Sequence, residues 1–506
     1  MDNTILSLKG ISKSFGGVHA LDQVDLEVKK GQIHCLMGEN GSGKSTLIKI
    51  ISGVYKPDQG EILLNGRKYE SLTPAESVKQ GVSIIYQDFS VFPNLTVAEN
   101  IFFGYVIAEN QKLTHNQENI RKAQAIAKEI GLEADMGEIL ENLSVAQKQM
   151  VAICRALLNN ARLIIFDEPT TALTQKEVKR LFSLIRDMRK KGVSTLFVSH
   201  KLEEVFEIAE EFTIIRNGKK VITTFAASIT REKFIYYMTG RKLSEDQFVC
   251  KEKTEQVPLL EVKGLFMEGA YRDISFSLYP GEILGIVGLL GSGRTELALS
   301  LFGMEPAQKG QIFKNGKEIK LTSVKQAMEH HIGYVPEDRL SEGLFLPQSI
   351  NWNVGISNLG MYAGRLGRLL KDKMRTVTQQ YVKSLSVNTT EIDKPANFLS
   401  GGNQQKVVIA RWLSCNPEIM IFNCPTVGVD IAAKFDIHKI LRTLAAQKIG
   451  IIIISDDIPE VYANCNRILI MQKGQIVKEL TNTETSETEL YSLIGSEYAD
   501  EKEAAG

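Results

Sequence analysis

The chain has 506 residues, more than a single hydrophobic core ordinarily serves, and at about 100–200 residues per domain this predicts two or three domains. Lysine and arginine total 60, and aspartate and glutamate also total 60, so the formal net charge is zero. This balance excludes a protein that is drawn to nucleic acid or to an anionic bilayer by its overall charge.

The N-terminal stretch MDNTILSLKGISKSF lacks the basic and then apolar pattern of a secretion signal. The longest apolar runs, such as IGIIIIS at 449–455, are far shorter than the roughly 18 residues that span a bilayer. We therefore expect neither export by a signal peptide nor insertion into a membrane. Cysteines without a Cys-x-x-Cys pair or a Cys/His cluster are expected to be reduced and mostly buried thiols. They are Cys35, Cys154, Cys250, Cys415, Cys424 and Cys465.

The segment GENGSGKS fits the phosphate-loop pattern G-x-x-x-x-G-K-[ST], follows an apolar strand, IHCLM, and opens an apolar helix, STLIKIISG. Glycines let backbone N–H groups turn toward phosphate oxygens at a helix start, the lysine reaches the outer phosphates, and the hydroxyl ligates magnesium. The alternative, a glycine-rich turn that binds nothing, is disfavoured by the strand-loop-helix context. The predicted ATP-binding residues here are Gly38, Glu39, Asn40, Gly41, Ser42, Gly43, Lys44, Ser45 and Thr46.

A second apolar strand, LIIFDEP at 163–169, ends in two acids. Beside the phosphate loop, Asp167 is expected to hold magnesium through its water shell and Glu168 to orient the attacking water, the alternative being a helix N-cap. The next predicted helix, 175–192, is followed by the strand STLFVSH, and this alternation favours an α/β sheet. The apolar face of that helix is formed by Val178, Leu181, Phe182, Ile185 and Met188.

The chain then repeats itself at a spacing of about 250 residues, which predicts two domains of one kind. GENGSGKS at 38–45 returns as GLLGSGRT at 288–295, and IFDEP at 165–169 returns as IFNCP at 421–425. The predicted organisation is a first domain over 1–240, a polar linker over 241–257, a second domain over 258–496 and a frayed tail over 497–506.

The order and spacing of these motifs resemble those of ATP-binding cassette (ABC) proteins with two cassettes fused in tandem. The resemblance covers nearly the whole chain and implies two P-loop NTPase domains of α/β class, each with an α/β core and a helical subdomain. It also implies that Gln87 in SIIYQDF senses magnesium, that His200 in FVSH contacts the terminal phosphate, and that Phe15 in KSFGG stacks on adenine. Taken singly, a histidine such as His200 is more often a satisfied core histidine and Phe15 a core aromatic, and it is the order and spacing of the motifs that favour the nucleotide-binding roles.

The second copy changes the residues on which this chemistry depends. Lys44 becomes Arg294, Gln87 becomes Glu337, Asp167 becomes Asn423, Glu168 becomes Cys424, and His200 becomes Asp456. The arginine can still grip phosphate through its planar fork, but Asn423 and Cys424 bring no charge to magnesium or to water. We expect no hydrolysis at this degenerate site, which comprises Gly288, Gly291, Ser292, Gly293, Arg294, Thr295, Asn423, Cys424 and, from the other copy, Ser144.

In the ABC family two cassettes face each other head to tail, and each ATP lies between the phosphate loop of one and the signature sequence of the other. The resemblance therefore assigns LSGGN at 399–403 to the ATP of the first copy. The residues concerned are Ser400, Gly401, Gly402 and, in the following loop, Asp430, which is Thr174 in the first copy.

The first copy's own signature, LSVAQ at 143–147, serves the second copy and has Val145 and Ala146 in place of glycines, which crowd the approach to phosphate. We therefore predict one hydrolytic composite site and one degenerate site. The alternative, that the second half is a decayed relic, fits poorly with its intact LSGG.

Three sequence motifs of the second copy resemble those of the fused ATPases of bacterial monosaccharide importers, the ribose, galactose, arabinose and xylose type. They are GSGRTE at 291–296, PEDR at 336–339 and LSGGNQQK at 399–406. The resemblance implies a translocase ATPase that uses ATP and Mg2+ and lies peripherally on the cytoplasmic face of the cell membrane. Its implied partners are membrane permease subunits, two in number, and through them an extracytoplasmic sugar-binding protein, with no nucleic acid.

The segment after Gln87, DFSVFPNLTVAENIFFG, is where the family receives a coupling helix, although ordinary helix packing explains it as well. Two alternatives stay open for the function. A nucleoside importer ATPase shares the fused plan, and a ribosome-associated tandem cassette protein is a soluble protein of another class. The family normally keeps Asp-Glu in its second copy, so Asn423 and Cys424 extend the degeneration.

Overall fold

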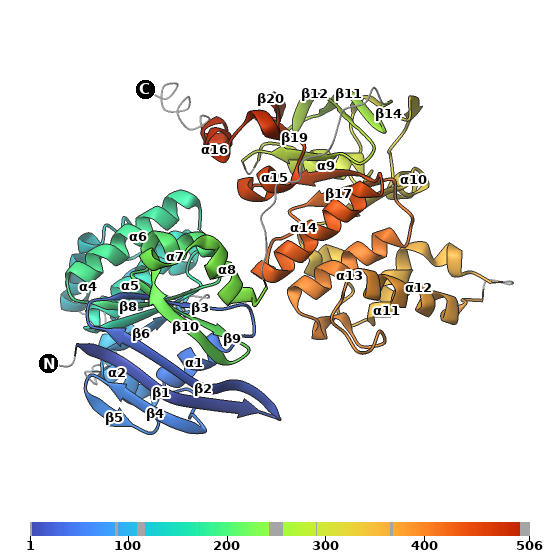
Figure 1. Ribbon diagram of the computed structural model, residues 1–506. Helices are drawn as coiled ribbons and strands as arrows, with labels where there is room; N and C mark the ends of the chain where they lie inside the picture. Colours follow the sequence, from blue (N-terminus) through green and yellow to red (C-terminus); the bar gives the residue numbers. More distant parts are fainter. Residues whose placement is uncertain are drawn as a thin grey trace, which may run out of the picture. The chain divides into compact units, whose positions relative to one another are not determined.

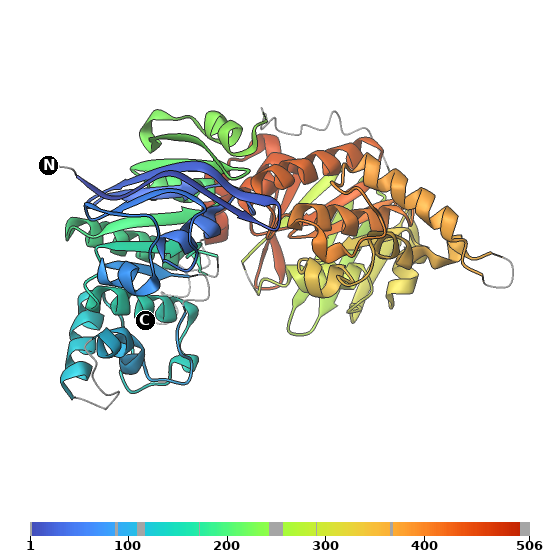
Figure 2. The ribbon, with the colours of Figure 1, turned by 90° about the horizontal axis from the view of Figure 1, so that it is seen from below.

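The computed structural model describes residues 3–86, 90–108, 117–171, 173–241, 257–289, 291–364 and 368–495. The chain divides into two compact units, Met1–Leu243 and Ser244–Gly506, which are drawn from two sides in Figures 1 and 2. All but the ends of the predicted linker 241–257, and the whole of the predicted tail 497–506, lie outside the described residues.

The first unit alternates strands and helices as its sequence predicts. Its strands are β1 (Thr4–Phe15), β2 (Val18–Lys29), β3 (Ile33–Met37), β4 (Gln59–Leu64), β5 (Arg67–Tyr69), β6 (Val82–Ile85), β7 (Leu163–Asp167), β8 (Ser194–Ser199), β9 (Glu211–Arg216) and β10 (Lys219–Phe225). Its helices are α1 (Lys44–Ile51), α2 (Pro74–Lys79), α3 (Val97–Ala108), α4 (Gln117–Glu129), α5 (Val145–Leu158), α6 (Gln175–Lys190), α7 (Leu202–Ile208) and α8 (Arg231–Thr239), with 3-10 turns η1 (Leu140–Asn142) and η2 (Ala226–Ser228).

Two sheets form the body of this unit. The antiparallel sheet has the strand order β2-β1-β4-β5, and the mainly parallel sheet has the order β10-β9-β3-β8-β7-β6. Strand β3 is parallel to both of its neighbours, β8 and β9, and β8 is parallel to β7. Because both faces of such a sheet are covered, every residue of β3 and β8 is buried. Their sequences therefore do not alternate between buried and exposed residues.

Helix α6 confirms the predicted amphipathic helix but ends at Lys190 instead of residue 192, since Gly192 adopts a positive φ of 85°. It begins after Thr174, whose side chain and that of Glu177 form a capping box. Four residues of the predicted apolar face are buried and pack on the sheet: Leu181, Phe182, Ile185 and Met188.

The second unit repeats this order of elements. Its strands are β11 (Leu260–Met267), β12 (Tyr271–Leu278), β13 (Ile283–Val287), β14 (Lys309–Lys314), β15 (Lys317–Ile319), β16 (Ile332–Val335), β17 (Ile419–Asn423), β18 (Gly450–Ile454), β19 (Arg467–Gln472) and β20 (Gln475–Thr481). Its helices are α9 (Arg294–Leu301), α10 (Val324–Glu329), α11 (Ile350–Gly355), α12 (Lys371–Ser384), α13 (Gly401–Leu413), α14 (Ile431–Ala446), α15 (Ile458–Asn464) and α16 (Glu487–Gly495). Shorter turns are η3 (Arg339–Gly343), η4 (Ile356–Tyr362), η6 (Ala396–Phe398) and η7 (Asn482–Glu484).

The sheets of the second unit match those of the first. Their orders are β12-β11-β14-β15 and β16-β17-β18-β13-β19-β20, with β13 parallel to β18 and β19. The predicted α/β class with a repeated nucleotide-binding core is therefore confirmed.

Each unit also carries a set of helices beside its sheets. In the first unit α3 and α4, in cyan tones, extend away from the blue and green strands (Figure 2). An isolated backbone bridge between Thr96 and Ile139 closes the base of this segment, and a bridge between Ser349 and Pro395 does the same in the second unit. These helices correspond to the predicted helical subdomains. Among the described residues, no helix is long and apolar enough to cross a membrane.

Candidate functional site

Three parallel strands of the first unit bring the predicted catalytic residues to one edge of the sheet. Met37 at the end of β3 pairs with Ser199 of β8, and Asp167 at the end of β7 pairs with Val198 of the same strand. The phosphate loop, Glu168 and His200 therefore leave the sheet at the same level. The carboxyl ends of parallel strands are where ligands bind in open α/β sheets.

The phosphate loop is shaped by glycines that no larger residue could replace. A Cβ atom on Gly38 would lie 2.3 Å from Ser42 Oγ, and Gly43, with φ of 108°, would place its Cβ 2.6 Å from the Ala20 carbonyl oxygen. The Ser42 hydroxyl is buried and finds no hydrogen-bond partner among the described residues. A buried polar atom without a partner is costly unless a ligand satisfies it, so the loop fits a phosphate.

Lys44, the first residue of α1, is 5% exposed and turns back over the loop. Its ammonium donates hydrogen bonds to the carbonyl oxygens of Gly38 at 2.6 Å and Glu39 at 3.0 Å. Burial lowers the pKa of this ammonium, although the carboxylates of Glu168 and Asp167 oppose the shift. The cation is thus desolvated in advance and is held where phosphate oxygens would enter.

Glu168 and His200 form the central pair of the first unit. Glu168 has a φ of 50°, and its N–H donates to the Val198 carbonyl oxygen at 3.0 Å, so the chain makes a left-handed turn directly after the strand. The Nδ1 atom of His200 lies 3.1 Å from Oε1 of Glu168. This hydrogen bond lowers the pKa of the Glu168 carboxyl and fixes the direction in which the carboxylate faces, as a group that orients water requires.

The neighbouring carboxyl, Asp167, behaves differently. Its pKa is raised, first because it is buried and second because Glu168 lies beside it, while Lys44 compensates only in part. Two partly buried carboxylates with too little positive charge favour a divalent cation, and the Ser45 hydroxyl at the start of α1 supplies a further oxygen. The donor set therefore fits magnesium. Gln87, the third predicted metal contact, lies outside the described residues.

Glu204 is a buried carboxylate near the Glu168–His200 pair that no sequence motif predicted. Glu204 is 6% exposed, accepts a hydrogen bond from Ser199 Oγ at 2.6 Å and also accepts one from the hydroxyl of Thr170. It thereby ties the end of β8, just before His200, to the residues that follow Glu168. The sequence repeat could have pointed to this residue, because the matching position of the second copy is also an acid, Glu460.

Phe15, the predicted adenine platform, lies at the end of β1 and is 42% exposed. Its ring meets that of Tyr55 edge-on with centroids 5.2 Å apart. The Lys13 ammonium lies 5.5 Å from the Phe15 centroid. An exposed aromatic that is braced by a second ring suits a stacking role, which stays a prediction.

In the second unit the phosphate loop keeps its backbone shape but changes its charges. Gly293 has a φ of 89°, and the Ser292 hydroxyl is again buried without a partner among the described residues. Arg294 donates from Nη1 to the Gly288 carbonyl oxygen at 2.6 Å. Its Nη2 atom lies 3.5 Å from Oδ2 of Asp456. The predicted changes at these two positions thus form an ion pair with each other.

In the second unit the end of β17 and the residue after it carry no ionised side chain. Asn423 is 2% exposed and donates from Nδ2 to the Tyr334 hydroxyl at 3.4 Å. Cys424 repeats the left-handed turn of Glu168 with a φ of 46°. Burial, supported by Glu337 and Asp456, raises the pKa of its thiol to about 12, so the thiol stays protonated at neutral pH. This site fits neither magnesium nor a water-orienting base.

The two signature sequences differ at their helix N-termini. Ser144 caps α5 through a capping box with Gln147, so its hydroxyl accepts from the Gln147 N–H at 3.3 Å. Ser400, at the start of α13, makes no side-chain cap to its helix within the described part of the chain, and its hydroxyl accepts from Asn403 Nδ2 at 2.8 Å instead. The N–H groups at the start of α13 are therefore left for an anion, whereas a side chain takes one at α5.

The residues around Ser400 are packed closely. A Cβ on Gly401 would lie 2.7 Å from Arg339 Nη2 and 2.9 Å from the Gly428 carbonyl oxygen. Arg339 donates to the carbonyl oxygens of Val427 at 2.7 Å and Gly428 at 2.8 Å, so it fixes the loop that precedes α14. Gly402 is equally confined, because its Cβ would lie 2.2 Å from that of Ala433.

Asp430 and Thr174 have the same local role in the two units. The Asp430 carboxylate caps α14 by accepting from the Ala433 N–H at 2.7 Å, as the Thr174 hydroxyl caps α6. A contact of Asp430 with ATP stays a prediction. The described cysteines form no disulfide with one another and all but Cys415 are buried, whereas Cys250 lies outside the described residues.

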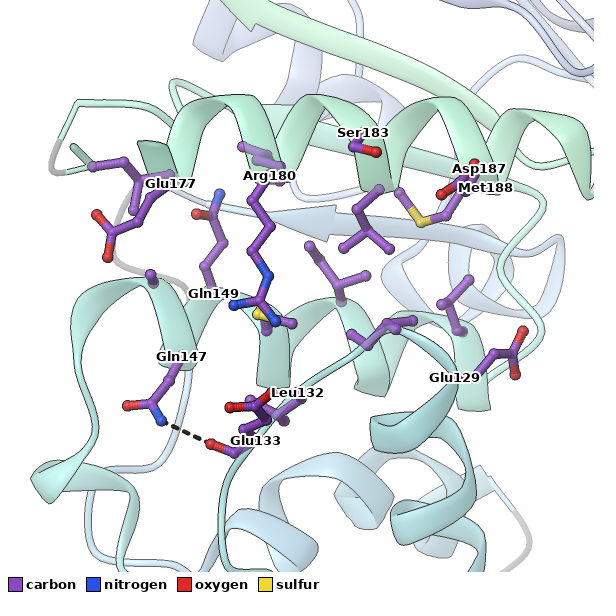
Figure 3. A pocket seen from close by; sticks show the side chains of 18 of the residues that line it. Glu129, Leu132, Glu133, Gln147, Gln149, Glu177, Arg180, Ser183, Asp187 and Met188 are labelled. Carbon is purple, nitrogen blue, oxygen red and sulfur yellow. Dashed lines mark hydrogen bonds between the residues drawn. The ribbon is translucent and has the colours of Figure 1, made fainter. Parts of the chain in front are cut away.

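A cavity of about 640 Å³ lies between α5 and α6 of the first unit. Arg180 reaches from α6 toward Glu133 (Figure 3) and donates to the Gly131 carbonyl oxygen. Gln147 donates from Nε2 to the Glu133 carbonyl oxygen at 2.9 Å on the other side (Figure 3). The lining includes Ser144 but no residue of the phosphate loop, so this cavity is separate from the predicted ATP site.

A family model, curated relatives and solved structures all match this chain to ATP-binding proteins of transporters. The family described as ABC transporter matches residues 21–171 and 271–427. The Ribose import ATP-binding protein RbsA 1 of Rubrobacter xylanophilus is 40% identical over 504 residues, which cover 98% of this chain and 99% of the relative. The Ribose import ATP-binding protein RbsA of Clostridium perfringens strain 13 is 40% identical over 495 residues, with coverage of 97% and 98%. A solved structure of MJ1267, an ATP-binding cassette of an ABC transporter in its ADP conformation, matches 47% of this chain and 99% of its own with 26% identity and a TM-score of 0.43.

Proposed function

This chain belongs to the ABC transporter family of ATP-binding proteins, and from that premise we propose that it is the ATP-hydrolysing subunit of an importer for a simple sugar. Relatives named as ribose import ATP-binding proteins, 40% identical over nearly the whole chain, support the sugar class. The observation that carries the hydrolytic function is the Glu168–His200 pair beside the buried Lys44.

Hydrolysis in the first unit follows from these positions. The backbone N–H groups of residues 38–46 and the Lys44 ammonium bind the phosphates of ATP, while Phe15 stacks on adenine. Glu168, whose pKa is lowered by the hydrogen bond with His200, orients the attacking water and accepts its proton. Magnesium, when bound, neutralises phosphate charge, and the residues that would hold it are Ser45, Gln87 and, through water, Asp167.

The second unit, in this proposal, completes the first site without hydrolysing ATP itself. The uncapped start of α13 and the small residues Gly401 and Gly402 suit a signature sequence that approaches the terminal phosphate of the ATP held by the first unit. The capping box at Ser144 and the side chains of Val145 and Ala146 suit a signature that has lost this task. The result is one hydrolytic composite site and one degenerate site.

The output of hydrolysis passes to separate permease subunits, two per chain, at the cytoplasmic face of the membrane. A sugar-binding protein outside the membrane delivers the substrate to them. Co-purification of the tagged chain from membranes, followed by reconstitution with its permease and uptake of labelled ribose and galactose, tests this proposal. Uptake that needs ATP and responds to a sugar supports it. Uptake of a nucleoside only, or recovery with ribosomes and no permease, would replace it by one of the two alternatives.

A further inference from the structure

The phosphate loop of the second unit carries a cation that is already paired. Arg294 is 5% exposed and lies at the start of α9, and Asp456, two-thirds exposed, faces its Nη2 atom at 3.5 Å. At the matching positions of the first unit, Lys44 donates to loop carbonyl oxygens, and His200 turns to Glu168. The acid thus stands where the first unit has an imidazole.

The other charges near this point have the same sign as Asp456. Glu337 and Asp456 both act on the Cys424 thiol, and Arg294 is the cation that opposes them. In the first unit the corresponding carboxylate, Glu168, lies near Lys44, Lys201 and the His200 side chain, with the Asp167 carboxylate beside it. A terminal phosphate would therefore meet Lys44, Lys201 and the His200 side chain beside two carboxylates in the first unit, and one guanidinium beside two carboxylates in the second.

The inner part of the second loop nevertheless fits a phosphate. A Cβ on Gly288 would lie 2.5 Å from both Ser292 Oγ and the Met471 carbonyl oxygen, so the backbone is confined as in the first unit. Ser292 Oγ and Asn423 Oδ1 are buried atoms that find no hydrogen-bond partner among the described residues. Both residues are less than 5% exposed, at 4% and 2%. Buried polar atoms of this kind indicate a polar ligand.

We propose that the second unit is a nucleoside diphosphate site, which holds ADP in preference to ATP and needs no divalent cation. The Asp456 carboxylate already pairs with the Nη2 atom of Arg294, which a terminal phosphate would otherwise bind. Asn423, in place of an acid, removes the reason for a metal ion. The inference rests on the proposed function only in taking the nucleotide to be an adenine nucleotide.

The test uses the full chain with Lys44→Ala, which removes the phosphate-binding ammonium of the first unit. Fluorescent mant-ADP and mant-ATP are titrated with and without EDTA, and 8-azido-ADP labelling followed by peptide mass spectrometry assigns the bound nucleotide to the second unit. We expect ADP to bind about tenfold more tightly than ATP, with no effect of EDTA. Adding Asp456→Asn should bring ATP to within about twofold of ADP. Adding Glu318→Gln, a matched loss of one exposed charge on β15, should leave the preference unchanged.

ATP bound as tightly as ADP in the parent chain, a preference that survives Asp456→Asn, loss of ADP binding in EDTA, or the absence of label in the second unit would each overturn the proposal. Because these readouts use a chain disabled at Lys44, they do not depend on turnover. Failure of the proposed function would appear separately, as absence of ATP hydrolysis by the unaltered chain.

Discussion

The Nδ1 atom of His200 lies 3.1 Å from Oε1 of Glu168, although the two residues follow different strands of the first unit. Each follows one of the adjacent parallel strands β8 and β7, so the sheet itself fixes their distance. At the matching positions the second unit has Asp456, which pairs with Arg294, and Cys424, which stays protonated. We therefore expect water activation at only one of these two otherwise similar sites.

Replacing His200 tests the hydrogen bond that holds the Glu168 carboxylate in place. We expect His200→Ala to lower kcat by about 100-fold, since removal of one positioned acid–base group costs about 10²–10⁴-fold. KM for ATP should change little, because Lys44 and the loop backbone remain. Steady-state hydrolysis over a range of ATP concentrations separates the two constants. His331→Asn, at an exposed histidine with φ of 57° that asparagine tolerates, is the control. An unchanged kcat in His200→Ala would remove the pair from the mechanism.

For the exposed ring of Phe15 we expect the opposite result: replacement should change KM for ATP and not kcat. Phe15→Ala should raise KM for ATP by roughly five- to tenfold and leave kcat unaltered, because base stacking is worth about 1–3 kcal/mol and lies away from the phosphates. Phe15→Trp keeps an aromatic face and should stay close to the parent. Titration with mant-ATP gives an independent value. A KM that is the same in the alanine and tryptophan variants would assign the ring a packing role against Tyr55.

Much of this fold and site could be predicted from the sequence, because the motifs have fixed relations to neighbouring elements. IHCLM before the phosphate loop and LIIF before Asp167 are buried parallel strands, and their carboxyl ends have to meet. The Arg294–Asp456 ion pair could not be predicted, since each change alone reads as a loss. Nor could the contrast between Ser144 and Ser400 at their helix starts, because it depends on the rotamers of Gln147 and Asn403. Such contacts depend on side-chain directions that periodicity does not fix.

Replacing Gly401, a residue of the second unit, should slow the ATP hydrolysis that we assign to the first unit. Its Cβ in Gly401→Ala would meet Arg339 Nη2 at 2.7 Å and the Gly428 carbonyl oxygen at 2.9 Å, so the start of α13 must shift. We expect ATP hydrolysis to fall about tenfold or more, while mant-ATP still binds to the first unit, because N–H groups at a helix start act only when correctly placed. Gly360→Ala is the matched control, since nothing lies within 4 Å of its Cβ. Equal rates in the two variants would argue against a role for this signature.

The second unit should have an acid-sensitive stability that depends on one buried carboxylate, Glu460. Glu460 is 2% exposed, and although burial alone would raise its pKa, the hydrogen bond from His438 and nearby Lys434 lower it from 4.5 to about 2. The stabilisation is therefore fully present above pH 4.5 and is lost as the pH falls toward 2.

Both tryptophans, Trp352 and Trp412, lie in the second unit, so urea unfolding followed by tryptophan fluorescence reports on that unit. We expect Glu460→Gln to cost on the order of 2–4 kcal/mol at pH 7, because His438 loses its buried partner, and to cost much less below about pH 3. Glu329→Gln, at an exposed acid of α10, should cost nothing at either pH. A cost that does not depend on pH would show that the ionised carboxylate is not what stabilises the unit.

The central claim, that ATP is hydrolysed at the first unit alone, is tested most directly by comparing Glu168→Gln with Cys424→Ser. The two substitutions stand at matching left-handed positions after β7 and β17, and each keeps the size of the side chain. We measure steady-state phosphate release by the full chain and retention of ATP in a filter-binding assay. Glu168→Gln should lose at least about 100-fold in hydrolysis while retaining ATP, and Cys424→Ser should stay within about twofold of the parent. Substantial hydrolysis in Glu168→Gln, or its collapse in Cys424→Ser, would contradict the account.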